Sequence, residues 1–176
     1  MNTKSPVGAS ERLDAELLRG LADRERGLFV IGRPAPILKR VIKPAFTWEH
    51  AEPGFTFPAL EYTISRGALE QFLSLAGRCG LEMTRRQYKN VPMMFFTDEP
   101  MQCIVTLFQK SGRLHASHEM EGFQPVPVGA TVRSIAKVEN RFIRSIGQFV
   151  KICCVTAIVD ECGLTPAVKT TATLVL

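Results

Sequence analysis

The sequence predicts an α+β domain in which one apolar helix precedes several long antiparallel strands. Apolar residues recur at helical spacing over 66–77, where Leu69, Phe72, Leu73 and Ala76 form a single stripe. From Arg113 onward the pattern changes to strand-like alternation, punctuated by Ser145-Ile146-Gly147 and Glu161-Cys162-Gly163. These two triplets are typical of hairpin turns, which is why the strands are expected to be antiparallel.

The elements before the long strands are predicted from the capping residues, glycines and prolines that bound them. Ser10 is a candidate N-cap for a helix that ends at Gly27 or Gly32, and the proline-rich stretch 33–58 predicts an ordered loop that wraps the domain. A short strand follows at 60–64. Ser65 then caps the apolar helix, which Gly77 or Gly80 ends. Because this helix is the most apolar one and lies between strands, we expect the sheet to pack around it.

The strands are predicted at 113–123, 132–142, 149–160 and 168–176. In the first of them strict alternation places His118 on the apolar face with Leu114, Ala116 and Met120. His115 then points the other way, toward solvent or a dimer partner. The sequence therefore predicts one central helix followed by an antiparallel meander.

Composition bounds the class of protein. Of 176 residues, 45 % are hydrophobic and 22 % charged, which is typical of one soluble globular domain and excludes disordered and membrane-spanning classes. The first twenty residues have no apolar signal region, so we expect a cytoplasmic location. The net charge of +5 is spread over short basic clusters without interleaved aromatic residues. This pattern argues against nucleic acid and suits a small anionic ligand such as coenzyme A.

The five cysteines have no CxxC spacing and no neighbouring histidines, which disfavours a zinc site or a disulfide framework. Cys153 and Cys154 lie in a β-branched run, where adjacent side chains point to opposite faces of a sheet. We interpret the cysteines as small buried apolar residues, and no metal site is expected.

Three segments resemble the MaoC-like hydratase/dehydratase family. The run Arg113 to Val132, RLHASHEMEGFQPVPVGATV, is similar to the stretch of these domains in which two acids are followed by a proline, a glycine and a threonine. Val91-Pro92-Met93-Met94-Phe95 and the segment 155–163 resemble two further family segments. The likeness is greatest to the N-terminal-type, non-catalytic half. It covers 53–176 and leaves 1–52 as an N-terminal extension.

The resemblance implies a hotdog fold, in which a curved antiparallel sheet wraps around a central helix. It also implies an acyl thioester substrate, carried on coenzyme A or acyl carrier protein, and no cofactor of the protein's own. Active members carry an aspartate and a histidine in a G-D-x-N-P-x-H segment just after the central helix. The matching segment here is Gly77 to Met83, in which Arg78 replaces the aspartate and Met83 the histidine.

Three other side chains are candidates for the acid–base chemistry. A desolvated His118 would stay neutral near pH 7, although a histidine on an apolar face is more often a hydrogen-bonded core residue. Glu82 and Asp98 are the acids nearest the expected site, although an acid in such a position is more often a solvated loop carboxylate.

Two further groups are candidates for substrate binding. Met93, Met94, Phe95 and Phe96 would line an acyl tunnel or form ordinary core. Arg85 and Arg86 would hold a coenzyme A phosphate or form a solvated basic face.

Three functions remain open from the sequence. The first is an enoyl-thioester hydratase/dehydratase, a lyase that forms a dimer through edge-to-edge sheet pairing. The second is a non-catalytic subunit that shapes the acyl tunnel in a heterodimer with another hotdog chain. The third is a diverged thioester enzyme, such as a double-bond isomerase or thioesterase, which needs one acid–base group or an activated water. We expect neither a nucleic acid nor a membrane as a partner.

Overall fold

The computed structural model describes residues 29–30, 43–78, 88–109 and 114–176. The leader helix expected from Ser10 lies outside these ranges, and so does the first part of the proline-rich stretch. No helix in the described ranges is long and apolar enough to cross a membrane.

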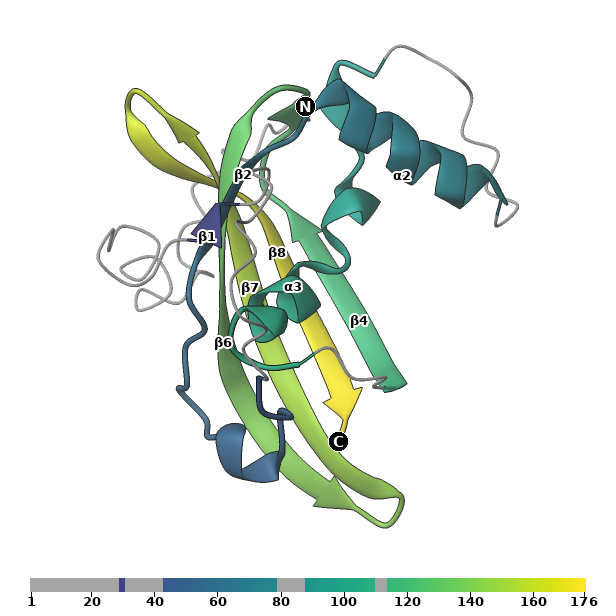
Figure 1. The fold of residues 1–176 in the computed structure, drawn as a ribbon, viewed down its shortest axis with the longest axis vertical. Coiled ribbons are helices and arrows are strands. Elements are labelled where there is room, and N and C mark those ends of the chain that lie inside the picture. Colours follow the sequence, from purple (N-terminus) through teal and green to yellow (C-terminus); the bar gives the residue numbers. More distant parts are fainter. Residues whose placement is uncertain (1–28, 31–42, 79–87, 110–113) are drawn as a thin grey trace, which may run out of the picture.

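One curved sheet forms the body of the described chain (Figure 1). Its strand order is β1-β2-β6-β7-β8-β4, and every pairing is antiparallel except that of β1 with β2. The strands are β1 (Phe29–Val30), β2 (Leu60–Thr63), β4 (Leu114–Gly122), β6 (Thr131–Arg144), β7 (Gly147–Asp160) and β8 (Gly163–Val175). A second small sheet pairs β3 (Asn90–Val91) with β5 (Val126–Pro127).

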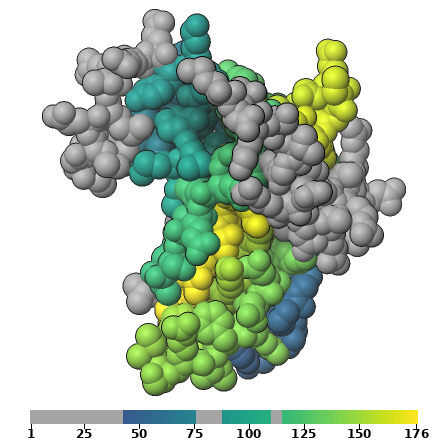
Figure 2. All heavy atoms as spheres, turned by 180° about the vertical axis from the view of Figure 1, so that it is seen from behind, coloured from purple at the N-terminus to yellow at the C-terminus, as the bar shows by residue number. Residues whose placement is uncertain are grey.

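The hairpins are where the sequence predicted them. Gly147 follows the turn between β6 and β7, and Gly163 follows the turn between β7 and β8, with φ values of +146° and +122°. These values lie in the region where a side chain is strained, so glycine suits both turns. Figure 2 shows the two hairpins at opposite ends of the molecule.

The helix around which the sheet curves is not the one that the sequence pattern favoured. The predicted apolar helix exists as α2 (Arg66–Arg78), and Ser65 Oγ accepts the backbone N–H of Ala68 at 3.1 Å. However, α2 stands to one side of the sheet, whereas α3 (Glu99–Leu107) lies against β6, β7 and β8 (Figure 1). The short 3-10 helices η3 (Trp48–His50) and η4 (Met93–Phe96) complete the fold.

The main core lies between α3 and the inner face of the sheet. Ile104 and Cys103 of α3 are fully buried against strand residues that share this face, namely Ala136, Val138, Val150, Ile152, Cys154, Ala172 and Leu174. Phe46 and Ala51 also belong to this core. The segment before β2 therefore packs as part of the domain.

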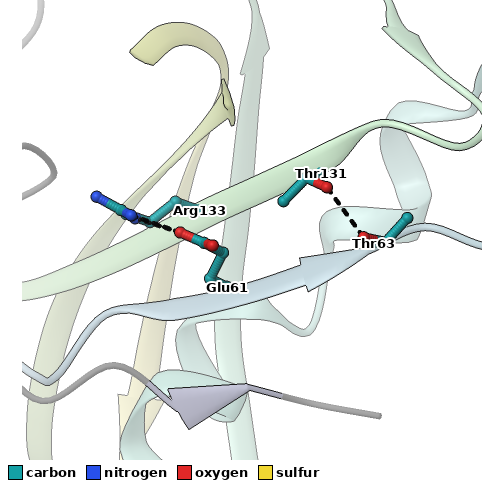
Figure 3. A network of polar contacts seen from close by, with 4 residues as sticks. All are labelled: Glu61, Thr63, Thr131 and Arg133. Atoms are coloured by element: carbon teal, nitrogen blue, oxygen red, sulfur yellow. Dashed lines mark hydrogen bonds and ion pairs between the residues drawn. The ribbon is translucent and has the colours of Figure 1, made fainter. Parts of the chain in front are cut away.

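The opposite, outer face carries a second apolar cluster and a polar pair. Cys153 lies there with Ile135 and Val155, so the adjacent cysteines Cys153 and Cys154 face opposite sides as expected. On the same face Arg133 binds Glu61, with Nε at 2.8 Å and Nη2 at 2.5 Å from Oε2 (Figure 3). This pair links β2 to β6.

A β-bulge in β4 overturns the expected orientation of His115. The register shifts between His115 and Ser117, so that His115 lies opposite Leu174 and His118 lies opposite Ala172. Directly opposed residues share a face, and both of these partners belong to the inner core. Because the bulge inserts one residue, His115 and His118 both lie on the inner face.

Candidate active site

The start of α3 carries two adjacent acidic residues, of which Asp98 is exposed and Glu99 is buried. Asp98 is the N-cap residue, Glu99 begins the helix and Pro100 occupies its first turn. Proline is favoured there because its missing N–H would have no partner in the helix. The positive end of the helix dipole is thus directed at the region around these side chains.

Glu99 is buried, with a relative exposure of 5 %. Its Oε1 accepts a hydrogen bond from the hydroxyl of Tyr62 on β2, whereas its Oε2 has no hydrogen-bond partner in the structure as described. Burial raises the pKa of Glu99, and the hydroxyls of Tyr62 and Ser134 act in the opposite direction. The arrangement favours a neutral carboxylic acid with one oxygen free.

The sheet beneath Glu99 is lined by hydroxyl and thiol groups. Ser134 of β6 and Thr156 of β7 share a buried hydrogen bond, with 2.8 Å between their oxygens. Thr170 of β8 is 1 % exposed, and its hydroxyl has no partner among the described residues. Cys154 is fully buried beside Cys103, and this contact together with burial raises the pKa of its thiol. The floor of the site is therefore polar but uncharged.

His118 reaches this region from the edge strand β4. Its ring lies 6.1 Å from that of His115 and nearly parallel to it, and within the described structure neither ring nitrogen has a hydrogen-bond partner. Burial and His115 lower the pKa of His118, while Asp98 acts against them. The imidazole is therefore neutral near pH 7, with an open nitrogen that can accept a proton.

The sequence-predicted site residues have different outcomes. Asp98 lies at the start of α3, and its charge acts on the imidazole of His118 on β4. Glu82, Arg85 and Arg86 lie outside the described residues.

The four expected tunnel residues form η4, which immediately precedes α3. Phe96 is fully buried, while Met93 and Met94 are exposed. Phe95 is half-buried and meets Phe72 of α2 edge to face, with 5.3 Å between the ring centroids. The segment therefore joins α2 to the core.

Sequence reasoning missed Glu99 and Tyr62. A signal for the helix was present in the order Asp98-Glu99-Pro100, since an Asp N-cap followed by a proline in the first turn is a helix-start pattern. Nothing local distinguishes Glu99 from Asp98, because only the packing of α3 against the sheet buries one and exposes the other.

No family model and no curated protein sequence matches this chain. Several solved structures match it in fold. They include the R-hydratase PhaJ1 from Pseudomonas aeruginosa, with 14 % identity, a TM-score of 0.53 and coverage of 70 % of this chain and 81 % of that one. A MaoC-like dehydratase from Rhodospirillum rubrum has 14 % identity, a TM-score of 0.50 and coverage of 75 % and 97 %. The ChsH1-ChsH2 complex from Mycobacterium tuberculosis has 15 % identity, a TM-score of 0.53 and coverage of 71 % and 98 %.

These likenesses confirm the hotdog fold that the sequence resemblance implied. A hydratase and a MaoC-like dehydratase are among the proteins that share this fold.

Proposed function

We propose that this chain binds an acyl thioester and catalyses hydration or dehydration of its acyl chain. The observation that carries the proposal is His118, whose open ring nitrogens lie on the inner face within reach of the charge of Asp98. The fold is the one found in a hydratase and a MaoC-like dehydratase, which supports the same reaction class.

The proposed chemistry begins with proton removal from the carbon next to the thioester carbonyl. A neutral His118 accepts this proton, and the nearby negative charge of Asp98 stabilises the imidazolium that forms. Negative charge develops on the thioester oxygen in the same step. The positive end of the α3 dipole favours an oxygen placed at the helix start.

Substrate binding is proposed for the residues that precede α3. Met93 and Met94 are exposed thioethers that adapt to an acyl chain, and the aromatic rings of Phe95 and Phe96 back them. Arg85 and Arg86 remain candidates for the phosphates of a coenzyme A or acyl carrier protein thioester. The proposed enzyme is therefore a lyase, and its substrate is carried on coenzyme A or acyl carrier protein.

A second candidate function is a tunnel-shaping subunit of a heterodimeric dehydratase. It is favoured by Arg78 and Met83, which stand where active relatives are expected to hold their aspartate and histidine. One structural neighbour is described as a complex of two different chains, ChsH1 and ChsH2. On this proposal the present chain contributes fold and binding surface, and the second hotdog chain carries the catalytic pair.

Turnover of crotonyl-type enoyl thioesters by the purified chain distinguishes the two candidates. We expect hydration by the wild type and a loss of about 10²–10⁴-fold in His118→Gln, which is the usual contribution of general acid–base catalysis. In this direction His118 returns the proton to the carbon next to the carbonyl. Turnover that appears only with a co-purified second hotdog chain would establish the subunit function instead. A His118→Gln variant as active as the wild type would remove His118 from the mechanism.

His115→Gln is the matched variant for this test, because His115 stacks on His118 and is itself exposed. In dehydration His118 acts as a base and must be neutral, so the dehydration rate falls as the pH drops through the pKa of His118. His115 lowers that pKa, so its removal moves the acid limb of the pH–rate profile to higher pH. We expect His115→Gln to retain most of the wild-type turnover at pH 8.

A further inference from the structure

We propose that Thr170 on β8 binds the oxygen on the third carbon of the acyl chain, beside His118. In dehydration this oxygen is the hydroxyl that leaves, and in hydration it is the water that adds. The inference rests on the proposed function and deepens it, because it names a second residue of the same site and a 3-hydroxyacyl group as its ligand.

Strand pairing places Thr170 next to His118. Met120 lies directly opposite Thr170. His118, two residues earlier on β4, lies opposite Ala172, so Thr170 and His118 are diagonal neighbours, about 7–8 Å apart. Cys154, which lies opposite Thr170 on β7, belongs to the inner core, so Thr170 shares the inner face with His118. A substrate with two adjacent carbons between these side chains can contact both of them.

Both side chains have unused hydrogen-bonding capacity. Thr170 is 1 % exposed, and its hydroxyl has no partner among the described residues. Within the same described part of the chain, both ring nitrogens of His118 also lack a partner. A hydroxyl that is buried without a partner costs stability, because it has lost its hydrogen bonds to water. Two such groups on neighbouring strands are explained together if one polar ligand satisfies both.

The chemistry of Thr170 selects a hydroxyl over a carbonyl oxygen. A threonine hydroxyl can both donate and accept a hydrogen bond, and Thr170 does neither with the described residues. A carbonyl oxygen would use only the donor, whereas the hydroxyl of a 3-hydroxyacyl chain or a water molecule would use both. The thioester oxygen already has the positive end of the α3 dipole, which leaves the oxygen on the third carbon for Thr170.

His118 and Thr170 together suffice for the reaction. In dehydration His118 takes the proton from the carbon next to the thioester carbonyl, a carbon–carbon double bond forms, and the carbon–oxygen bond on the third carbon breaks. The imidazolium returns the same proton to the departing hydroxyl, which leaves as water. Thr170 donates its hydrogen bond to this oxygen and keeps its own proton, so no further acid is needed. Hydration is the reverse sequence.

Met120 separates Thr170 from the edge of the sheet. It is half-buried, and its sulfur accepts a hydrogen bond from the Thr97 hydroxyl at 3.6 Å. A thioether side chain is unbranched and has three rotatable bonds, so it changes conformation at little cost. A substrate held at His118 reaches the Thr170 hydroxyl when Met120 turns aside.

Thr170→Val separates a binding role from a structural one. Valine has nearly the same shape, favours strands and removes the unpartnered hydroxyl, so we expect a variant at least as stable as the wild type. Thr156→Val is the matched control on β7, because the Thr156 hydroxyl is bonded to Ser134 and its loss leaves that partner unsatisfied. Chemical denaturation should show a loss for Thr156→Val alone. An equal loss in Thr170→Val would mean that its hydroxyl has a partner in the folded chain, and would overturn the inference.

Calorimetry with two coenzyme A thioesters tests the ligand. Binding is measured in the His118→Gln background, which blocks turnover. In this background we expect 3-hydroxybutyryl-CoA to bind about tenfold more tightly than butyryl-CoA, which lacks the 3-hydroxyl, as one buried hydrogen bond predicts. Adding Thr170→Val should abolish this preference, and adding Thr170→Ser should retain it.

Turnover supplies a second readout. We expect Thr170→Val to lower kcat/KM for hydration of crotonyl-CoA about 10- to 100-fold, whereas Thr170→Ser and the exposed Thr165→Val retain most of the rate. If the wild type is active and Thr170→Val is equally active, or keeps the preference for the 3-hydroxyl, the role of Thr170 is overturned while the proposed function stands. If the wild type neither binds nor turns over these thioesters, the proposed function is overturned as well.

Discussion

Two glutamates show how neighbouring residues set the state of a carboxylate in this fold. Glu61 lies on the outer face, where Arg133 binds one of its oxygens through two nitrogens (Figure 3). Glu99 lies on the inner face, where Tyr62 and Ser134 act on it as neutral hydroxyls. The first carboxylate has a counter-charge, so it serves to join strands. The second has none, and burial raises its pKa.

The state of Glu99 has a consequence for stability. Its pKa in the folded protein is raised above the value of 4.5 that an unperturbed glutamate has, so the folded chain binds more protons than the unfolded chain above that pH. Stability is therefore lost as the pH rises from about 4.5 through the folded pKa, by at most about 1.4 kcal/mol per pH unit. Glutamine at this position does not ionise and escapes the loss.

We expect the free energy of unfolding of Glu99→Gln, relative to the wild type, to increase with pH above about 4.5. Denaturant titrations of both proteins at a series of pH values measure this difference. The comparison cancels His118, whose lowered pKa gives the opposite dependence below its usual value of 6.5. A difference that does not change with pH would mean that folding leaves the pKa of Glu99 unchanged.

At the scale of elements, the sequence predicted those helices and strands whose apolar residues recur at regular spacing. The long strands, both hairpins and α2 followed from alternation, turn residues and helical spacing. The segment Cys103-Ile104-Val105-Thr106 was not predicted as a helix, and its β-branched residues favour a strand. It is nevertheless part of α3, because packing against the sheet outweighs local propensity in so short a helix.

The candidate site was predicted only in part, for the same reason. Asp98 and His118 were recognisable from residue type and from their place beside predicted elements. The pairing of Glu99 with Tyr62 depends on how α3 packs against the sheet, since the two residues are 37 positions apart in the chain. The inner-face position of His115 depends on a bulge, which strict alternation cannot anticipate.

The central position of α3 leads to an expected difference between the two helices. Ile104→Ala should destabilise the chain by about 2–5 kcal/mol, since Ile104 is fully buried against the inner face. Leu75→Ala on α2 is the control, because Leu75 is 59 % exposed and should change stability by about 0.5 kcal/mol or less. Chemical denaturation measures both, and equal losses would contradict the central role of α3.

At the scale of the whole molecule, the sheet as far as it is described leaves one side of its edge strand β4 without a partner strand. Within the described chain β4 pairs only with β8, whereas the other edge is shielded by the short strand β1. An edge strand presents a row of unpaired backbone groups, which makes it a template for a further strand. We therefore infer that β4 pairs with β4 of a second hotdog chain, either a copy of this one or a different one.

This pairing would place the second chain beside His118, because His118 belongs to the same strand. We expect sedimentation of the purified wild type to show a reversible dimer, and turnover per chain to fall on dilution below its dissociation constant. Hydrogen exchange locates the contact: the β4 amides that face away from β8 should slow as the dimer forms, while exchange at the exposed β6–β7 turn stays unchanged. A chain that remains monomeric at all concentrations yet is fully active would contradict β4 pairing as a condition for the site. A monomer that becomes active only when a different hotdog chain is added would identify that chain as the partner of β4.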